Sequence, residues 1–260
     1  MAAWKDFCHA PGMWKGFYWS GTSGLVLPVP NKQAFPPDYR DKSRLCYYAS
    51  LFSSIEVNSS FYKVPQAVTI NRWARETPAD FRFTFKLHRD ITHVKQLAFD
   101  PAAVHHFMNV IDGAGSKKGS LLIQFPPSTT VDAFGQLEAL LDTIGDHRGW
   151  RVALEFRHPS WYIGETYELA DEYRCSVVLH DIPKSRNSRL NAGADFVYLR
   201  FHGPAGDYRG GYTPMQLEEY AASIRGWLRE GKEVFVYFNN TIGDAVANLG
   251  ELDRLVREHE

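Results

Sequence analysis

Strand-length runs of apolar, β-branched and aromatic residues recur along the chain and alternate with segments of helical periodicity. Eight such runs lie at 17–24, 52–61, 81–87, 120–128, 150–159, 176–183, 196–204 and 233–241. Amphipathic segments with a helical period lie at 39–51, 67–76, 102–114, 131–144, 165–173, 215–229 and 243–258. The alternation predicts strands and helices in turn along the chain.

Alternating strands and helices favour parallel pairing through right-handed crossovers. Eight repeats in 260 residues predict a single-domain (β/α)8 TIM barrel over residues 17–260, preceded by an N-terminal extension, residues 1–16. The segment KSRNSRLNAGAD is short and polar, so the helix between strands six and seven is expected to be short or missing. A doubly wound sheet is the alternative, but no GxGxxG follows the first strand and no linker marks a second domain.

The two faces of the expected strands differ in composition. On the fifth strand the apolar residues Val152, Leu154 and Phe156 alternate with a set that includes Glu155 and Arg157. One parity of a barrel strand faces the helices and the other faces the axis. The same alternation recurs on other strands, so polar side chains are expected to gather around the axis.

These axis-facing residues become ionisable towards the carboxyl ends of the strands, where barrel enzymes assemble their sites. The expected lining is Glu56, Asn58, Lys86, Gln124, Glu155, Arg157, Arg200, His202, Tyr237 and Asn239, and the sixth strand adds either His180 or Asp181. A structural ion-pair network without chemistry is the alternative. Desolvating several charges is costly, and a core needed only for stability would use Val, Ile and Leu.

Composition and charge narrow the classes of partner. The formal net charge of -1 gives no global attraction to nucleic acid or anionic membranes, so any polyanion site must be a local patch. Cys8, Cys46 and Cys175 form no CxxC pair, which favours a reduced, cytoplasmic setting. There is no signal-peptide stretch and no apolar run long enough to span a bilayer, so no membrane partner is expected.

Seven motifs occur together in one order along the chain. They are GTSG (21–24), EVNSSFY (56–62), FKLHRDITH (85–93), LIQFPPS (122–128), EFRHPSW (155–161), YLRFHGP (198–204) and YFNNTIGDA (237–245). As a set they resemble the domain of unknown function 72 family, also called YecE-like. The resemblance implies a TIM barrel similar in outline to endonuclease IV and the xylose isomerases, and it implies no reaction, because the family's activity is unassigned.

By this resemblance, the family's polar signature positions fall on residues of several strands and their following loops. They are Glu56, Asn58, Tyr62, Lys86, His93, Gln124, Glu155, Arg157, His158, Trp161, Arg200, His202, Asn239 and Asn240. The stretch GLVLPVPNKQAFP departs from the family, in which many members carry a Trp and a Tyr-x-x-Trp pair at this point. The role of that aromatic pair is therefore not transferred to this chain.

An anion site is the best-motivated chemistry. Lys86, Arg157 and Arg200 can converge as cations, and arginine suits forked recognition of phosphate or carboxylate. The loops HGPAGDYRGGYT and NNTIGDA follow strands seven and eight, where barrels frequently bind phosphate. A surface loop stabilised by tyrosine packing is the alternative for DYRGGY.

Acid–base chemistry is the second element, and a metal site is the third. A histidine near neutral pH or a buried carboxyl can exchange protons. Histidines and carboxylates also fall near strand ends, but no HExxH or comparable spacing occurs and the nearby cations would repel a metal. No metal ligand is therefore assigned, and the cofactor is left open.

The residues predict an enzyme that acts on a small anionic, phosphorylated substrate by acid–base hydrolysis or isomerisation at the C-terminal barrel mouth. The catalytic residues assigned are Glu56, Lys86, Glu155 and His202. The substrate-binding residues assigned are Asn58, Tyr62, His93, Gln124, Arg157, His158, Trp161, Arg200, Tyr212, Asn239 and Asn240. Two alternatives stay open: a nucleic-acid-binding or repair module that grips a backbone or a flipped base, and a non-catalytic barrel that binds a metabolite.

Overall fold

The computed structural model describes residues 15–145 and 149–258, so most of the expected N-terminal extension lies outside the described residues. The strands are β1 Tyr18–Thr22, β2 Ser54–Val57, β3 Arg82–Lys86, β4 Lys118–Phe125, β5 Arg151–Phe156, β6 Ser176–Val177, β7 Leu179–His180, β8 Phe196–Phe201 and β9 Glu233–Phe238. The helices are α1 Arg44–Tyr48, α2 Ser59–Tyr62, α3 Ala67–Glu76, α4 Arg89–Thr92, α5 Pro101–Ile111, α6 Phe134–Ile144, α7 Gly164–Glu172, α8 Pro214–Arg229 and α9 Ala245–Arg257.

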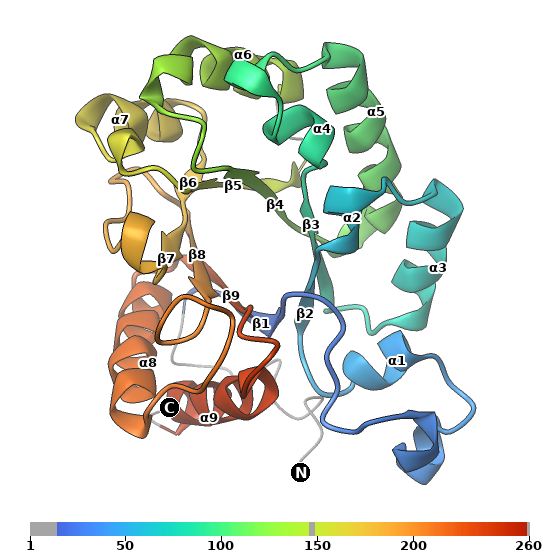
Figure 1. Ribbon diagram of the computed structural model, residues 1–260. Helices are drawn as coiled ribbons and strands as arrows, with labels where there is room; N and C mark the ends of the chain where they lie inside the picture. Colours follow the sequence, from blue (N-terminus) through green and yellow to red (C-terminus); the bar gives the residue numbers. More distant parts are fainter. Residues whose placement is uncertain (1–14, 146–148, 259–260) are drawn as a thin grey trace.

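Strands and helices alternate as the hydrophobic pattern predicts (Figure 1). The expected second strand is cut short because Asn58 adopts a helical backbone conformation, with φ -71° and ψ -21°, and begins α2. The expected helix at 39–51 is also shorter, since α1 begins only after Ser43, whose side chain accepts a hydrogen bond from the Cys46 N–H. Between β7 and β8 a 3-10 turn at Pro183–Ser185 replaces a full helix, as expected.

All strand pairs within the sheets are parallel, and they form two sheets. One sheet has the order β2-β3-β4-β5-β6 and the other β1-β9-β8-β7. Strands β6 and β7 are two parts of one extended segment that is interrupted at Val178, whose N–H donates to the Leu154 carbonyl at 2.9 Å. At the other junction, a single bridge pairs Ser23 with Glu56. The structure therefore shows an α/β fold with parallel sheets, and no continuous eight-stranded ladder is detected among the described residues.

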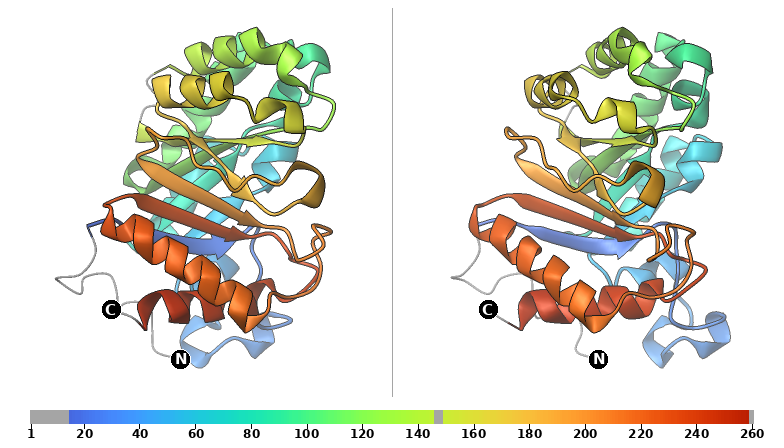
Figure 2. Two further views of the ribbon diagram at one scale, coloured as in Figure 1. Left: turned by 90° about the vertical axis from the view of Figure 1, so that its left-hand side faces the viewer. Right: turned by 60° about the vertical axis from the view of Figure 1, so that its left-hand side comes forward.

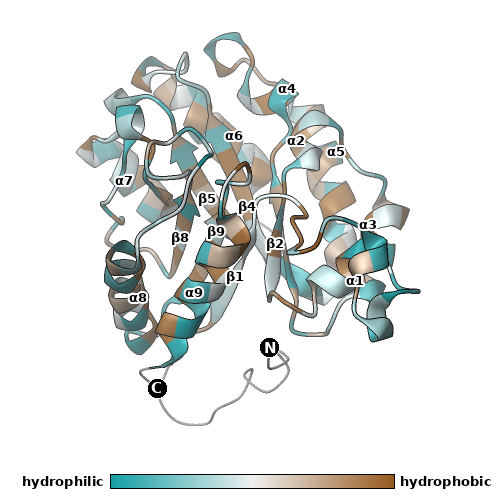
Figure 3. Cartoon of the chain, turned by 60° about the horizontal axis from the view of Figure 1, so that its bottom comes forward, coloured by the Kyte–Doolittle hydropathy of each residue, from teal (hydrophilic) through white to brown (hydrophobic). Residues whose placement is uncertain are grey.

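The strands surround a central axis and the helices lie outside them (Figure 1). Helices α8 and α9 pack side by side against β9 and β1 (Figure 2). The outer helices carry both apolar and polar segments, as expected for elements that cover a sheet with one face (Figure 3). Among the described residues, none of the helices combines the length and hydrophobicity needed to cross a bilayer.

Strand parity divides the core in the way that the sequence predicts. The larger cluster, between strands and helices, includes Val152, Leu154 and Phe156 of β5. The smaller cluster, on the other face of the strands, includes Ala153 and Tyr198. The axis side of the strands therefore carries an apolar cluster, and its charged residues lie closer to the carboxyl ends of the strands.

Strands β1 and β2 lie close together without a regular ladder, and Tyr48 joins them. Its hydroxyl accepts from the Thr22 N–H at 2.7 Å and donates to the Ser54 carbonyl at 3.1 Å. Gly21 allows this approach, because a Cβ there would lie 2.0 Å from the Ser54 carbonyl oxygen and 2.9 Å from the Tyr48 hydroxyl. The junction between the two sheets thus depends on the absence of a side chain at Gly21.

We expect Gly21→Ala to lower the free energy of unfolding by about 1–3 kcal/mol or more, because the added methyl group overlaps backbone. Gly135→Ala is the matched control: nothing lies within 4 Å of a Cβ at that position in α6. The control should leave stability unchanged or raise it by up to about 1 kcal/mol. Urea unfolding of both variants measures the effect, and equal stability of the two would contradict the tight junction.

Candidate functional site

A group of charged and polar side chains crosses the axis, and we call it the arginine–glutamate network. Its members are Glu56, Glu155, Arg157, Arg200 and His202. Arg200 of β8 lies at its centre and is only 2% exposed. Its Nε and Nη2 donate to Glu56 Oε2 and Oε1 at 2.9 and 2.6 Å, and its Nη1 donates to Glu155 Oε2 at 2.8 Å. One guanidinium therefore binds carboxylates from β2 and β5 at once.

Every oxygen of the Glu56 carboxylate accepts two hydrogen bonds. Besides Arg200, Oε1 accepts from the Ser23 hydroxyl and Oε2 from the Tyr198 hydroxyl, each at 2.6 Å. Burial alone would raise the pKa of Glu56, but the charge and hydrogen bonds of Arg200 outweigh it and hold this pKa below its usual range. Glu56 is therefore a fixed anion without a free lone pair for a substrate.

Glu155 is held in a similar way by two arginines. Its Oε1 accepts from Arg157 Nε, and its Oε2 accepts from Arg200. Burial would raise the pKa of this carboxyl, but the positive charges of Arg157 and Arg200 hold it well below its usual range. At neutral pH Glu155 is thus ionised and serves as the counter-ion of both arginines.

His202 is neutral and has one defined tautomer. Its Nε2 faces two donors, Arg157 Nη2 at 3.1 Å and Arg200 Nη1 at 3.2 Å, so this nitrogen accepts. Its Nδ1 donates to Asp181 Oδ1 at 3.1 Å. Burial is the largest cause that lowers the pKa of His202. The charges of Arg200 and Arg157 also lower it, and together these effects outweigh the hydrogen bond to Asp181 and the charge of Glu155. The imidazole therefore orients the arginines instead of carrying a mobile proton.

Asp181 connects this network to the loop after β8. Besides binding His202, its carboxylate accepts from the Tyr212 hydroxyl, and Tyr212 in turn accepts from the Gly203 N–H at 2.7 Å. The ambiguous parity of the sixth strand has a simple explanation, because the strand is interrupted at Val178. Sequence reasoning left Asp181 out of the assigned site, together with Ser23 and Tyr198, although the GTSG motif and the strand parity pointed to the last two.

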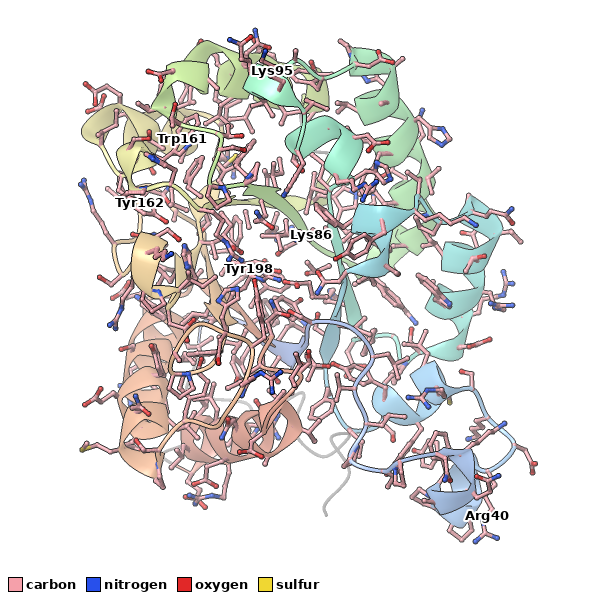
Figure 4. The ribbon with its side chains drawn as sticks, viewed as in Figure 1. Arg40, Lys86, Lys95, Trp161, Tyr162 and Tyr198 are labelled. Carbon is pink, nitrogen blue, oxygen red and sulfur yellow. The ribbon has the colours of Figure 1, made fainter. Side chains whose placement is uncertain are left out.

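Lys86 lies at the end of β3 and has no carboxylate partner in the part of the chain that the structure describes. Its Nζ donates to Gln124 Oε1 at 2.8 Å and lies 4.1 Å from the centroid of the Phe61 ring. Burial, and then the charge of Arg200, lower the pKa of Lys86 to about 8. Figure 4 shows Lys86 and Tyr198 on the axis side of the strands. Lys86 is therefore mainly protonated at neutral pH, but it loses its proton at a lower pH than an ordinary lysine.

His93 packs on the same aromatic ring. Its imidazole lies edge-on to Phe61 with the ring centroids 4.8 Å apart, and its Nδ1 is 2.8 Å from the Thr92 hydroxyl. Burial, and then the charges of Lys86 and Arg157, lower the pKa of His93 to about 4. A neutral imidazole thus lies near the Lys86 amine.

Several assigned substrate-binding residues lie apart from the network. Trp161 is fully buried outside the strands, where it stacks on Phe156 with the ring centroids 4.6 Å apart and donates to the Thr129 carbonyl (Figure 4). His158 accepts from the Ser160 N–H and so caps the turn that leads to Trp161. Both residues contribute to the loop after β5, and none of the hydrogen bonds described for them joins them to the network.

The three assigned asparagines lie in different surroundings. Asn240 is buried and donates to the Gly210 carbonyl and to Asn248 Oδ1, which anchors the loop after β8. Asn239 is half-buried at the end of β9, and its N–H donates to the Phe201 carbonyl. Asn58 lines an apolar cavity of about 300 Å³ between β2, β3 and helices α1 and α3, and its buried Oδ1 has no hydrogen-bond partner.

Tyr62 on α2 is 69% exposed and Tyr208 in the loop after β8 is 38% exposed. The Tyr208 ring lies 5.7 Å from the His202 ring, measured between centroids. Among the described residues, no group of three or more His, Cys, Asp or Glu is placed to share a metal ion. The arrangement therefore offers cations, a neutral histidine and exposed aromatic rings to a ligand.

We expect Lys86→Met to stabilise the protein in a pH-dependent way. Between pH 8 and the usual lysine value of 10.5 the unfolded chain binds more protons than the folded one, so the native protein gains stability as the pH rises through this window. Below pH 8 the buried charge destabilises the fold, and methionine should raise the free energy of unfolding by up to roughly 3 kcal/mol. That advantage should disappear by about pH 10.5.

Urea unfolding at pH 7 and pH 10 measures this difference. Lys63→Met, at an exposed lysine that follows α2, is the control and should change stability by less than about 0.5 kcal/mol at both pH values. A Lys86→Met advantage that grows with pH, or that is absent at pH 7, would contradict a half-buried ammonium whose hydrogen-bond partner, Gln124, is neutral.

The chain matches known proteins along most of its length. A family model described as "Protein of unknown function DUF72" matches residues 19–260. The UPF0759 protein YunF of Bacillus subtilis (strain 168) is 25% identical over 265 residues, which cover 88% of this chain and 91% of YunF. Both matches span the strands that supply the arginine–glutamate network.

Solved structures agree on the fold. A DUF72 family protein from Enterococcus faecalis V583 has a TM-score of 0.76 and 19% identity, covering 92% of this chain and 95% of that one. The protein named SacUVDE has a TM-score of 0.57 and 7% identity, covering 94% of this chain and 99% of that one. At these identities the likeness shows the fold alone. With its family match over residues 19–260, the chain belongs to the DUF72 family of proteins of unknown function.

Proposed function

We propose that this protein is an enzyme that binds a small anionic, phosphorylated ligand at the carboxyl ends of its strands, with Arg157 as the anion contact and Lys86 as the acid–base group. The observation that supports this is the unequal use of the cations. Each of the three Arg200 nitrogens donates to a carboxylate, whereas Arg157 Nη1 and the Lys86 amine have no carboxylate partner among the described residues. These donors are available to a ligand.

Proton exchange is best assigned to Lys86. A group whose pKa lies near the working pH transfers protons most effectively, and the pKa of Lys86 is lowered to about 8. Glu56, Glu155 and His202 keep a place in the proposed site as residues that hold Arg157 and Arg200 in position. Hydrolysis and isomerisation both remain compatible with one lysine acid–base group.

We also propose that the single domain, residues 17–260, is a (β/α)8 barrel. Two junctions support closure. The segment containing β6 and β7 pairs with β5 on one side and with β8 on the other. At the second junction, the Gly24 N–H donates to the Glu56 carbonyl at 2.8 Å, beside the Ser23–Glu56 bridge. The cytoplasmic setting inferred from the scattered cysteines stays a prediction.

We expect Arg157→Gln to weaken binding of inorganic phosphate by roughly 10- to 100-fold, since a charge-assisted hydrogen bond contributes about 1.5–3 kcal/mol. Arg151→Gln is the matched control, because Arg151 lies at the opposite end of the same strand, β5, and pairs with Glu233 at 2.6 Å. Calorimetric titration measures both affinities. Equal binding by the two variants would remove Arg157 from the site.

Nucleic-acid binding is the second candidate, and the exposed rings of Tyr62 and Tyr208 favour it. Single strands bind to proteins through aromatic stacking and cations, with strong salt dependence. For this function, Tyr62→Ala should weaken binding of a single-stranded oligonucleotide by about 1–3 kcal/mol, and affinity should fall as salt rises. An oligonucleotide that fails to bind at low salt, while inorganic phosphate binds, would leave the small-ligand function.

A further inference from the structure

The Lys86 amine is held in a way that suits a nucleophile. Both nearby carboxylates, Glu56 and Glu155, accept from arginines, so neither fixes the lysine as an ammonium. The amine has a neutral hydrogen-bond acceptor in Gln124 and an aromatic face in Phe61. Its pKa is lowered to about 8, first by burial and then by Arg200. A substantial fraction of neutral amine is therefore present at physiological pH.

Lys117 shows that a buried lysine with a lowered pKa is not by itself a nucleophile. Its Nζ donates to the carbonyl oxygens of Ala74 and Thr77 and to the Thr77 hydroxyl, so all three N–H groups are used to anchor the end of α3. Burial also lowers the pKa of Lys117. Lys86 differs from it in geometry, because its amine keeps N–H groups without a partner among the described residues.

The side chains of Lys86 and Arg157 reach neighbouring residues. Lys86 is level with Ala153 in the strand register and Arg157 lies four residues farther along, but the Lys86 amine donates to Gln124. Gln124 pairs in register with Glu155, which accepts from Arg157. Both side chains face the axis side. A ligand whose phosphate and reactive carbon are a few bonds apart can contact both groups.

We propose that Lys86 forms an imine with the carbonyl carbon of an aldehyde or ketone ligand whose phosphate group is held by Arg157. This deepens the proposed function and rests on it, because it names the substrate class of the same site as phosphorylated carbonyl compounds. A protonated imine withdraws electrons from the adjacent carbon and eases removal of its proton, which is the chemistry that an isomerisation needs.

The bond changes balance without a further reactant. The neutral Lys86 nitrogen attacks the carbonyl carbon, an N–C bond forms, and the carbonyl π electrons move to oxygen, which takes a proton to give a carbinolamine. The nitrogen loses a proton, the hydroxyl takes one, and the C–O bond breaks to release water. Counted from the Lys86 ammonium and the carbonyl compound, the overall products are a protonated imine and one water molecule. The neutral His93 imidazole, beside the same Phe61 ring, can then accept a proton from the adjacent carbon.

Pyridoxal 5′-phosphate tests this inference, because it combines an aldehyde with a phosphate. The full-length protein is incubated with it, reduced with borohydride to fix any imine, and mapped by peptide mass spectrometry. We expect labelling at Lys86 to exceed labelling at exposed Lys63 and at buried Lys117 by at least tenfold. Arg157→Gln should lower the Lys86 labelling by about tenfold, to the level given by pyridoxal without phosphate.

Each outcome has a defined meaning. Labelling that is no higher at Lys86 than at Lys63, in a protein that still binds inorganic phosphate through Arg157, overturns the imine and leaves the proposed function. Absence of both phosphate binding and Lys86 labelling overturns both. Labelling of Lys86 that is unchanged in Arg157→Gln and equal for pyridoxal overturns the assignment of the phosphate to Arg157.

Discussion

The hydrogen bonds between one buried guanidinium and two buried carboxylates fix the positions around which the rest of the site is arranged. Arg200 reaches from β8 to Glu56 on β2 and to Glu155 on β5, so three strands from both sheets meet at one side chain. Taking each ion out of water costs several kcal/mol, which only well-made hydrogen bonds offset. Removing one partner would leave an uncompensated buried charge at a cost of about 3–5 kcal/mol. The charged centre is therefore held in place from three strands, and the proposed chemistry is assigned to its neighbours.

That constraint separates groups that hold the site from groups that can meet a ligand. Each carboxylate oxygen of Glu56 and Glu155 accepts a hydrogen bond, and both ring nitrogens of His202 are hydrogen-bonded. Arg157 of this network and the neighbouring Lys86 each keep N–H groups that have no hydrogen-bond partner in the described part of the chain. In this arrangement the arginines and glutamates pair with one another, and the neighbouring Lys86 amine pairs with the neutral Gln124. Burial and the charge of Arg200 then lower the pKa of the amine, and Gln124 orients it.

The axis-facing parity was predictable from sequence because alternation along a strand has a period of two residues. That period predicts that Glu56, Glu155 and Arg200 face the same side, and in the structure Arg200 is within hydrogen-bond distance of both glutamates. The assignment of roles was not predictable in the same way. Whether a carboxylate is free or saturated depends on partners such as Ser23 and Tyr198, which come from distant parts of the chain.

Loops were less predictable than strands for a physical reason. No periodicity constrains the direction of a side chain after a strand has ended, so a Trp in a polar motif can point either way. Trp161 packs outside the strands on Phe156, although its motif also contains Glu155 and Arg157. Asp181 was ambiguous because the strand before it is interrupted at Val178.

The ionisation of the two buried glutamates is the most direct test of this division of roles. Carboxyl carbons of 13C-labelled glutamate report protonation in the folded protein through their NMR chemical shifts. We expect the carboxyl carbons of Glu56 and Glu155 to keep the shift of the ionised form from neutral pH down to acid unfolding, because the pKa values of both are lowered by the arginines. Titration of either carboxyl near neutral pH in the folded protein would contradict the assignment and would favour a role for that residue in proton transfer.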